Sequence, residues 1–178
     1  MNDIAYVRGV LDGDGFVDMY HPNPRLGLET ISKGFAEAFS GALNKIGYIP
    51  RLSERDRTRT SNGYTWSWHS YQIRATCNNF FMEELMNLNV LPEENKLSYL
   101  IGFFQSEGCF RIHKYPKREC WIWHITNKDL TRLKIIQSIL NSFGIKSGLI
   151  TKKDGISMLY VQRRIDITKL LELGVKKK

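Results

Sequence analysis

The stretch YVRGVLDGDG at residues 6–15 returns in altered form as YLIGFFQSEG at residues 99–108. Tyrosine falls on tyrosine, glycine on glycine and acid on acid, 93 residues apart throughout. In both copies two small residues are separated by three positions, and an acid and a glycine follow at once. A single offset predicts a duplicated fold, and two halves of about ninety residues fit a pseudo-dimer better than a solenoid.

Both halves are expected to fold in the same order. An apolar helix carries each motif, and two strands, an amphipathic helix, two more strands and a closing helix follow. In the second half, Lys128-Asp129 marks the start of the amphipathic helix. The order αββαββα, given twice, predicts an α+β fold with antiparallel sheets. We expect residues 1–91 and 96–178 to form the halves and residues 92–95 to link them. The first helix and strand pair are expected at about residues 4–13, 16–20 and 26–32, and again at 97–106, 108–113 and 120–126.

The composition predicts a globular protein with an acidic partner. Lys and Arg number 26 against 18 Asp and Glu, a formal net charge of +8, and 42% of the residues are hydrophobic. The sequence contains no apolar run of about 18 residues, so no membrane-spanning helix is expected. Its first residues do not resemble a signal peptide. Three cysteines without a CxxC pair favour an intracellular, reducing compartment, either cytoplasm or organelle. Charge alone fits DNA-binding, ribosomal and membrane-surface proteins equally well.

The small residues of the two motifs recur one helical turn apart. They are Gly9 and Gly13 in the first copy, and Gly102 and Ser106 in the second. Residues at this spacing share one helix face, so the two helices can pack backbone to backbone. A single such pattern can arise by chance, but matched spacing in both halves argues against chance. The sequence therefore predicts a helix interface between the halves.

The two acids are predicted at the C-terminal ends of these helices. Free carbonyls there carry partial negative charge, so the carboxylates of Asp14 and Glu107 would lower stability. Two such penalties side by side make sense if a cation binds between them. Oxygen-only ligation suits Mg²⁺, which takes one or two carboxylates plus substrate phosphates. The alternative is that each acid merely begins a turn before a glycine.

The two motifs resemble the paired signatures of the LAGLIDADG homing endonucleases in their monomeric, two-motif form. The resemblance covers nearly the whole chain and implies a pseudo-twofold saddle whose sheets lie in the major groove of double-stranded DNA. It implies that Asp14 and Glu107, with the carbonyls of Gly13 and Ser106, share about two or three Mg²⁺ or Mn²⁺ ions. The implied activity is metal-dependent hydrolysis of both strands of a long, pseudo-palindromic target, leaving 3′ overhangs. The implied role is intron homing by a monomer that acts as a pseudo-dimer.

The family also places a polar or basic residue at the end of the second strand, near the attacking water. Lys33 and Asn127 match that position in the sequence, where Lys33 could polarise the site and Asn127 could form a hydrogen bond. Many members carry an additional lysine near each active site, and the candidates here are Lys96 and Arg111. Gln105 stands where the motif often has aspartate.

Strand alternation predicts which residues read the DNA. Val17, Met19, Phe110 and Ile112 are expected to face the core. Arginine and glutamine can pair with base edges, and lysine with phosphates. A solvated strand face is the alternative for any one of the outward residues, and the four tryptophans are expected to pack or flank. The expected DNA-binding residues are Asp18, Tyr20, Arg51, Ser53, Arg55, Arg57, Arg59, Gln72, Arg74, Arg111, His113, Lys152 and Gln162.

Two Cys-x-x-x-His sequences raise the possibility of a zinc site. A hairpin that turns at Pro116-Lys117 would place Cys109 opposite His124, and His113 opposite Cys120. Four positions along a strand span roughly 13 Å, so the two pairs cannot share one tetrahedral ion. Free thiols are therefore expected.

Two other functional classes compete with the endonuclease. An RNA maturase that assists intron splicing, or a catalytically silent DNA-binding relative, would share the fold. A generic basic RNA-binding protein would explain the charge but neither acid. Because both Asp14 and Glu107 are present, the sequence favours cleavage.

Overall fold

The computed structural model describes residues 1–20, 22–86, 91–116 and 118–177. Lys117, predicted in the turn of a hairpin, therefore lies outside the described residues, as do residues 21, 87–90 and 178. Each half follows the predicted order αββαββα. The first half comprises α1 (Asp3–Asp12), β1 (Gly15–Asp18), β2 (Arg25–Thr30), α2 (Lys33–Lys45), β3 (Arg51–Ser61), β4 (Tyr64–Thr76) and α3 (Asn79–Met86). The second comprises α4 (Glu93–Glu107), β5 (Gly108–Tyr115), β6 (Arg118–Asn127), α5 (Leu130–Ser142), β7 (Gly148–Thr151), β8 (Ser157–Val161) and α6 (Arg164–Glu172).

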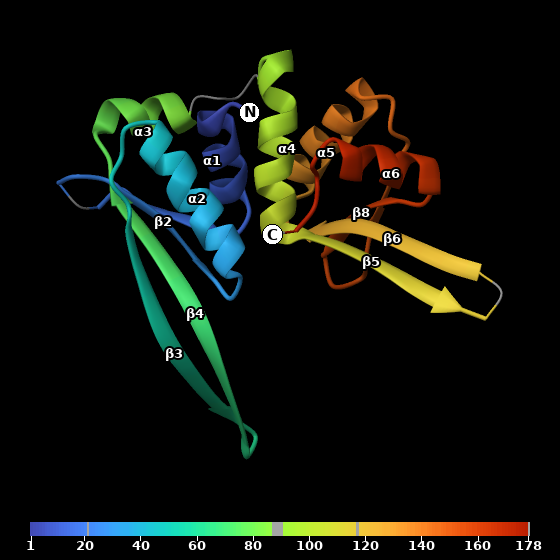
Figure 1. Cartoon of the computed structure of the whole chain (residues 1–178), viewed down its shortest axis with the longest axis horizontal. Helices are drawn as coiled ribbons and strands as arrows, with labels where there is room; N and C mark the ends of the chain where they lie inside the picture. The colour runs from blue at the N-terminus through green and yellow to red at the C-terminus, as the bar shows by residue number, and fades with distance from the viewer. Residues whose placement is uncertain (21, 87–90, 117, 178) are drawn as a thin grey trace.

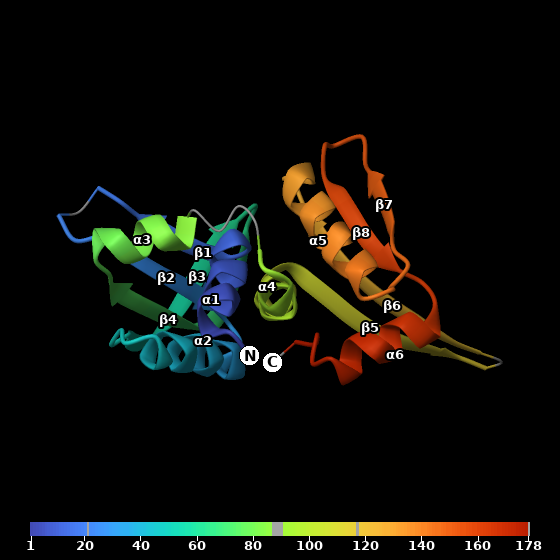
Figure 2. The same ribbon diagram turned by 90° about the horizontal axis from the view of Figure 1, so that it is seen from above.

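Two four-stranded antiparallel sheets have the same strand order, β1-β2-β4-β3 and β5-β6-β8-β7. In Figure 1, α1 and α4 stand side by side in the middle, and a sheet slopes away on either side of them. Figure 2, seen from above, places the remaining helices of each half with its own sheet. The duplicated α+β fold with a central two-helix interface is therefore confirmed.

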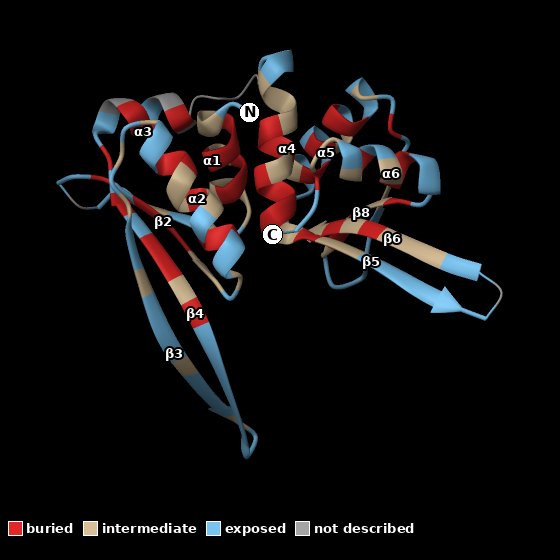
Figure 3. Ribbon diagram, viewed as in Figure 1, coloured by how far each residue is buried: buried red, intermediate tan, exposed pale blue. Residues whose placement is uncertain are grey.

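The sheets differ in which hairpin is long. In the first half β3 and β4 have 11 and 13 residues. In the second half the long hairpin is β5–β6, with 8 and 10 residues, whereas β7 and β8 have only 4 and 5. The outer parts of both long hairpins are exposed (Figure 3). Each half thus contributes one extended arm, but the arms come from different strand pairs.

The central helices approach closely because glycine leaves room for it. A Cβ added to Gly9 would lie 2.2 Å from the carbonyl oxygen of Tyr99, and one added to Gly102 would lie 2.3 Å from that of Tyr6. Both distances are far inside van der Waals contact, so any side chain at either position would push the helices apart.

Two buried tyrosines cross this interface in a pseudo-symmetric pair. The Tyr6 hydroxyl donates to Gln105 Oε1 at 2.6 Å, and the Tyr99 hydroxyl donates to Asp12 Oδ2 at 2.9 Å. Burial raises the pKa of both phenols, so both remain neutral donors. Gln105 therefore accepts the same kind of hydrogen bond as Asp12, which accounts for glutamine at that position.

Each half has its own hydrophobic core. In the second, the rings of Phe104 and Trp123 stack with centroids 4.7 Å apart and planes inclined by 6°. No helix within the described residues is long and apolar enough to span a membrane.

Some expected boundaries were wrong. Residues 93–95, expected in the linker, form the first turn of α4, because Pro92 occupies the N-cap and Glu93 and Glu94 favour the positive end of the helix. Strand β1 ends at Asp18, so Met19 is 51% exposed and does not face the core.

Candidate functional site

Asp14 and Glu107 meet at one end of the central helix pair. Asp14 follows Gly13, the C-cap of α1, and Glu107 is the last residue of α4. A Cβ added to Gly13 would lie 2.4 Å from Ser106 Cβ and 3.3 Å from Glu107 Cγ. The two motif ends are therefore in direct contact, and the four predicted metal-binding positions lie together.

The acid pair carries unfavourable electrostatics. Burial raises the pKa of Glu107, and the negative charge of Asp14 raises it further. Lys177, Asn127 and Arg132 act in the opposite direction. A carboxylate in this situation is stabilised by any cation placed between the two acids.

Asn127, the last residue of β6, lies beside the second acid. Its Nδ2 donates to Glu107 Oε1 at 3.0 Å. This hydrogen bond orients the carboxylate and favours its ionised form. Asn127 is thus placed where the sequence put it, within reach of the acid pair.

Lys33 is not the counterpart of Asn127. Gly15 pairs with Leu28 in the first sheet, and Gly108 pairs with Ile125 in the second, so Leu28 and Ile125 are equivalent. Asn127 lies two residues after Ile125, and the equivalent residue of the first half is therefore Thr30. Lys33 is instead the exposed first residue of α2. The sequence match was wrong because the strand ends at Thr30 and Ser32 caps the helix, accepting a hydrogen bond from Phe35 N at 3.3 Å.

Each acid borders its own hollow. The hollow beside Asp14 has a volume of about 310 Å³, and the one beside Glu107 about 560 Å³. The first is also lined by Glu29, Thr30, Ile31, Trp68 and Ser70. The second is also lined by Asp12, Gly13, Thr126, Asn127, Lys128, Asp129, Arg132 and Ile156. Two hollows on either side of one acid pair suit two reacting groups related by the pseudo-twofold axis.

The donor atoms at the acid pair fit a hard divalent cation. They are carboxylate oxygens, with the backbone carbonyls of Gly13 and Ser106 adjacent in the chain, and Mg²⁺ prefers such oxygen ligands. Within the described ranges, no group of three or more His, Cys, Asp or Glu side chains could hold a metal ion. An ion here would therefore complete its coordination with water or phosphate oxygens.

Two cations at the site were missed from the sequence. Arg132, on α5, donates to the backbone carbonyl of Asp12 and lies 3.3 Å from its carboxylate. Lys177 donates through Nζ to the carbonyls of Gln105 and Ser106, both at 2.6 Å. Arg132 could have been found from its place in the first turn of α5, whereas Lys177 stands in a lysine run with no local pattern.

Lys96 is not a site lysine. It pairs with Glu93 in the first turn of α4, at the opposite end of the helix from Glu107. Glu107 lies eleven positions after Lys96 in the helix, a distance of about 16 Å along the axis. Arg111 lies on exposed β5, where it lowers the pKa of His124 after the larger effect of burial.

The predicted arginine run lies on one face of the first sheet, which we call the open face. Residues directly opposite in antiparallel strands share a face. On the other face of β4, Ile73 and Ala75 are buried in the core beneath the helices. The open-face pairs of β3 and β4 are Arg51–Arg74, Ser53–Gln72, Arg55–Ser70, Arg57–Trp68 and Arg59–Trp66. Gln72 is only 5% exposed, so the predicted DNA contact at this residue was wrong.

The remaining predicted DNA contacts are scattered over both halves. Asp18 pairs with Arg25 at the end of β1, and Tyr20 follows in a fully exposed position. In the second half the exposed Arg111 and His113 alternate with Phe110, which packs against the core. Ile112, expected to face the core as well, is 41% exposed, because β5 extends there beyond the core into the exposed arm. The last two predicted contacts, Lys152 and Gln162, are exposed and follow β7 and β8.

One arginine of the open face is already paired. Arg57 donates through Nε and Nη2 to the two carboxylate oxygens of Glu29, at 2.9 and 2.8 Å. Ser70 donates to the same carboxylate at 3.0 Å. The hydrogen bonds from Arg57 and Ser70 hold the pKa of Glu29 below its usual value, and Arg57 has the larger effect. Glu29 therefore keeps a negative charge in the middle of a basic surface.

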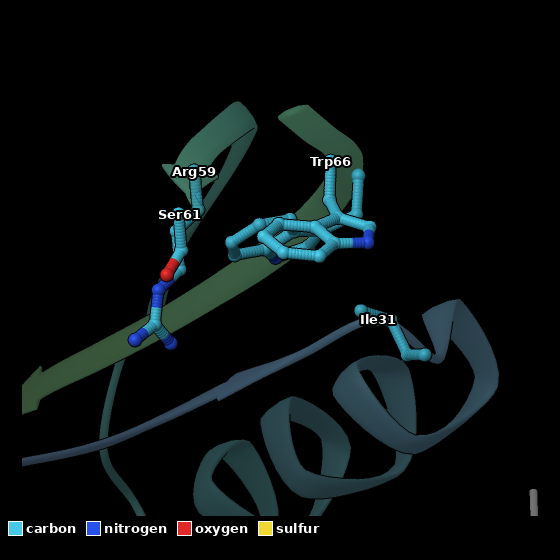
Figure 4. A pocket seen from close by; sticks show the side chains of 5 residues that line it. Ile31, Arg59, Ser61 and Trp66 are labelled. Carbon is cyan, nitrogen blue, oxygen red and sulfur yellow. The ribbon is translucent and has the colours of Figure 1, made fainter. Parts of the chain in front are cut away.

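An apolar hollow of about 570 Å³ adjoins the Asp14 side of the site. Figure 4 shows it between the strands, with Trp66 above Ile31 and with Arg59 and Ser61 at the other side. Trp66 is 51% exposed and Trp68 41%. Trp68 and Ile31 line both this hollow and the one beside Asp14, so the two are continuous. Trp66 and Trp68 therefore flank the site, as expected.

The strand register rules out the shared zinc site. Cys109 pairs with His124 and His113 with Cys120, as predicted for the hairpin. Cys77, Cys109 and Cys120 are all free. The two Cys–His pairs therefore lie four positions apart along the hairpin and do not meet at one point.

Comparisons with known proteins agree with this geometry. The family model of the LAGLIDADG-like domain matches residues 2–85 and 94–173. An uncharacterized protein of Methanocaldococcus jannaschii is 26% identical over 162 residues, which are 85% of this chain; the chain spans only 58% of the length of that relative.

Solved structures share the fold. The homing endonuclease I-DmoI, in complex with DNA and Mn, superposes with a TM-score of 0.64 at 15% identity, covering 99% of this chain and 98% of that one. Full-length DUF199/WhiA from Thermotoga maritima superposes with a TM-score of 0.67 at 16% identity, covering 100% of this chain and 57% of that one.

Proposed function

The chain belongs to the LAGLIDADG-like family, and from this premise we propose that it is a site-specific, divalent-metal-dependent DNA endonuclease that cuts both strands of its target. The observation that carries the proposal is that Asp14 and Glu107 lie together where the C-terminal ends of the two central helices touch. Nothing in the packing requires two carboxylates there, and Glu107 is held at an electrostatic cost. A DNA clamp without catalysis would be better served by neutral residues at both positions, since carboxylates repel phosphate.

Asp14 and Glu107, with the carbonyls of Gly13 and Ser106, would hold the metal. Bound Mg²⁺ or Mn²⁺ supplies Lewis-acid activation of water and stabilisation of the leaving oxygen. Asn127 holds Glu107 in place and presents an amide to the hollow beside it. Thr30 lines the corresponding hollow beside Asp14. The two halves therefore offer similar but unequal surroundings to the two DNA strands.

The two arms would follow the DNA on either side of the cut. The open face of β3–β4 carries a row of arginines, and β5 carries Arg111 and His113. Arginine can read purine edges in the major groove, and phosphate contacts position the duplex. Because the arms are built from different hairpins, the target is expected to be an imperfect palindrome.

The proposal is tested with a plasmid library that carries randomised inserts. The purified chain is incubated with the library and Mg²⁺, and cut molecules are sequenced. We expect double-strand breaks with 3′ overhangs at one family of related sequences. Absence of cleavage in Mg²⁺ and in Mn²⁺ contradicts the proposal, and tight binding to intron RNA in that case favours a maturase.

Replacing Glu29 with glutamine should strengthen DNA binding. The substitution removes a negative charge from the open face and frees Arg57 from its ion pair, so Arg57 can reach a phosphate. One additional phosphate contact should make the slope of log K against log salt more negative by about one. The measurement is the affinity for a fixed duplex at several salt concentrations.

Glu54→Gln is the matched control for this prediction. Glu54 lies on the same hairpin and pairs with Tyr71, on the face opposite to Arg57. The Glu54→Gln substitution removes the same charge without freeing an arginine toward the DNA. The slope of log K against log salt should therefore stay at the value of the original protein. Equal slopes for all three proteins would show that Arg57 does not contact phosphate.

Trp68→Ala should relax sequence preference close to the cut. Trp68 forms apolar surface beside Asp14, which suits the methyl group of thymine. Losing one apolar base contact should reduce discrimination at one or two base pairs by roughly tenfold, while cutting continues. The readout is the cleavage profile of the randomised library, with Trp68→Phe as the control that retains an aromatic ring. An unchanged profile for Trp68→Ala would exclude the hollow from base recognition.

A further inference from the structure

Lys177 already supplies a cation to the acid pair. Its Nζ donates to the carbonyl oxygens of Gln105 and Ser106, each at 2.6 Å. The Ser106 carbonyl directly precedes Glu107, and it is the backbone atom assigned above to the metal. Asp14 and Glu107 both act electrostatically on the Lys177 ammonium. One monovalent cation therefore uses the atoms and the field that a divalent cation would use.

The C-terminal end of α4 explains why an ammonium is held there. The last carbonyls of a helix have no partner within it and carry partial negative charge. Helix α4 has no basic residue in its last turn, so the positive charge must come from elsewhere in the chain. Lys177 provides it, as Arg132 does for the Asp12 carbonyl of α1.

The backbone that delivers Lys177 is fixed by the turn that ends α6. Gly174 has a φ of +83°, and Val175 N donates to Leu170 O at 2.9 Å while Gly174 N donates to Leu171 O at 3.0 Å. This is the Schellman arrangement, which needs glycine at the left-handed position. Val175 is fully buried in the core of the second half. Val175 thus anchors the backbone two residues before Lys177, and only the flexible side chain of Lys177 reaches the site.

We propose that Lys177 is a displaceable internal cation, which neutralises the acid pair in the absence of metal and leaves the Ser106 carbonyl when a divalent ion binds there. This inference rests on the proposed metal binding by Asp14 and Glu107. A carbonyl oxygen that binds a divalent ion at about 2.1 Å cannot also keep an ammonium at hydrogen-bond distance without strong repulsion between the two cations. The side chain can withdraw into solvent, because Lys177 as a whole is exposed and its anchor does not need to move.

Amine labelling tests the displacement on the unmodified protein. The full chain is treated with an acetylating reagent in the presence and absence of Mg²⁺, and labelled peptides are quantified by mass spectrometry. Labelling of Lys177 should increase several-fold with Mg²⁺, whereas its exposed neighbour Lys176 should label equally in both conditions. Equal labelling of Lys177 with and without Mg²⁺ overturns the inference.

A titration with Mn²⁺ alone tests the competition. Without its competing ammonium, Lys177→Ala should bind Mn²⁺ roughly tenfold more tightly than the original protein. Lys176→Ala removes an equal charge one residue away and should bind Mn²⁺ within about twofold of the original affinity. Unfolding temperatures with and without Mn²⁺ provide a second readout, and the stabilisation by Mn²⁺ should be larger in Lys177→Ala.

The outcomes separate this inference from the proposed function. If Mn²⁺ binds and depends on Asp14 and Glu107, but Lys177→Ala binds it equally or more weakly, Lys177 does not compete and only this inference fails. If Mn²⁺ does not bind to any of these proteins, the metal site fails and the proposed function fails with it.

Discussion

Asp14→Asn and Glu107→Gln should each abolish double-strand cleavage while leaving DNA binding intact. Each substitution keeps the size of the side chain but removes a negative oxygen ligand from the shared site. Metal-ion catalysis contributes several kcal/mol of transition-state stabilisation, and a loss of about 4 kcal/mol slows the reaction roughly 10³-fold. The measurement is single-turnover cleavage of the selected target with Mg²⁺. Cutting by either variant at the original rate would remove the acid pair from the mechanism.

The DNA affinity and the unfolding temperature of the same two variants serve as controls, because neither should fall when cleavage is lost. Without metal, each should bind the target at least as tightly as the original chain, because a charge that repels phosphate is gone. The pKa of Glu107 is raised in the folded protein, so the folded state holds the proton more strongly than the unfolded state. Its contribution to stability is present at low pH and is lost as pH rises through the folded pKa. At neutral pH, Glu107→Gln should therefore raise the unfolding temperature of the metal-free protein.

The elements that could be predicted from sequence are those with local signals. The spacing of small residues in both motifs directly predicts contact between the two helices, because only small residues let two backbones touch. Asp129 was recognisable as the start of α5, and its side chain accepts hydrogen bonds from Thr131 N and Arg132 N. The register of the β5–β6 hairpin followed from the position of Pro116. Each of these depends on a few neighbouring residues.

The features that were missed depend on parts of the chain that are far apart. The counterpart of Asn127 is set by where β2 ends, and no local signal showed that this strand stops at Thr30. Glu29 meets Arg57 only because β4 lies between their strands and brings them to one face. Lys177 reaches α4 through the glycine turn after α6, and a run of lysines gives no hint of such a contact. The chemistry of the acid pair was therefore readable, while the cations around it were not.

Gly102→Ala should destabilise the whole protein far more than its size suggests. The new methyl group would lie 2.3 Å from the carbonyl oxygen of Tyr6 and 3.0 Å from Val10 N, both of them backbone atoms of α1. Backbone cannot rotate away as a flexible side chain can, so the two central helices must separate. Overpacking costs about 3 kcal/mol at the upper end of its usual range, which corresponds to a fall in Tm on the order of 10 °C in a chain of this length.

Gly41→Ala is the matched control, since it makes the same chemical change within helix α2. A Cβ there meets nothing within 4 Å, so only the preference of alanine for helices remains, worth about 0.5–1 kcal/mol of stabilisation. The two variants should therefore shift the Tm in opposite directions in thermal unfolding followed by circular dichroism. Because the same separation would move Glu107 away from Asp14, Gly102→Ala should also weaken Mn²⁺ binding at temperatures where it is still folded, whereas Gly41→Ala should not. A Gly102→Ala protein with unchanged Tm would mean that the central helices do not touch at this glycine, and the placement of the acid pair at their ends would fall with it.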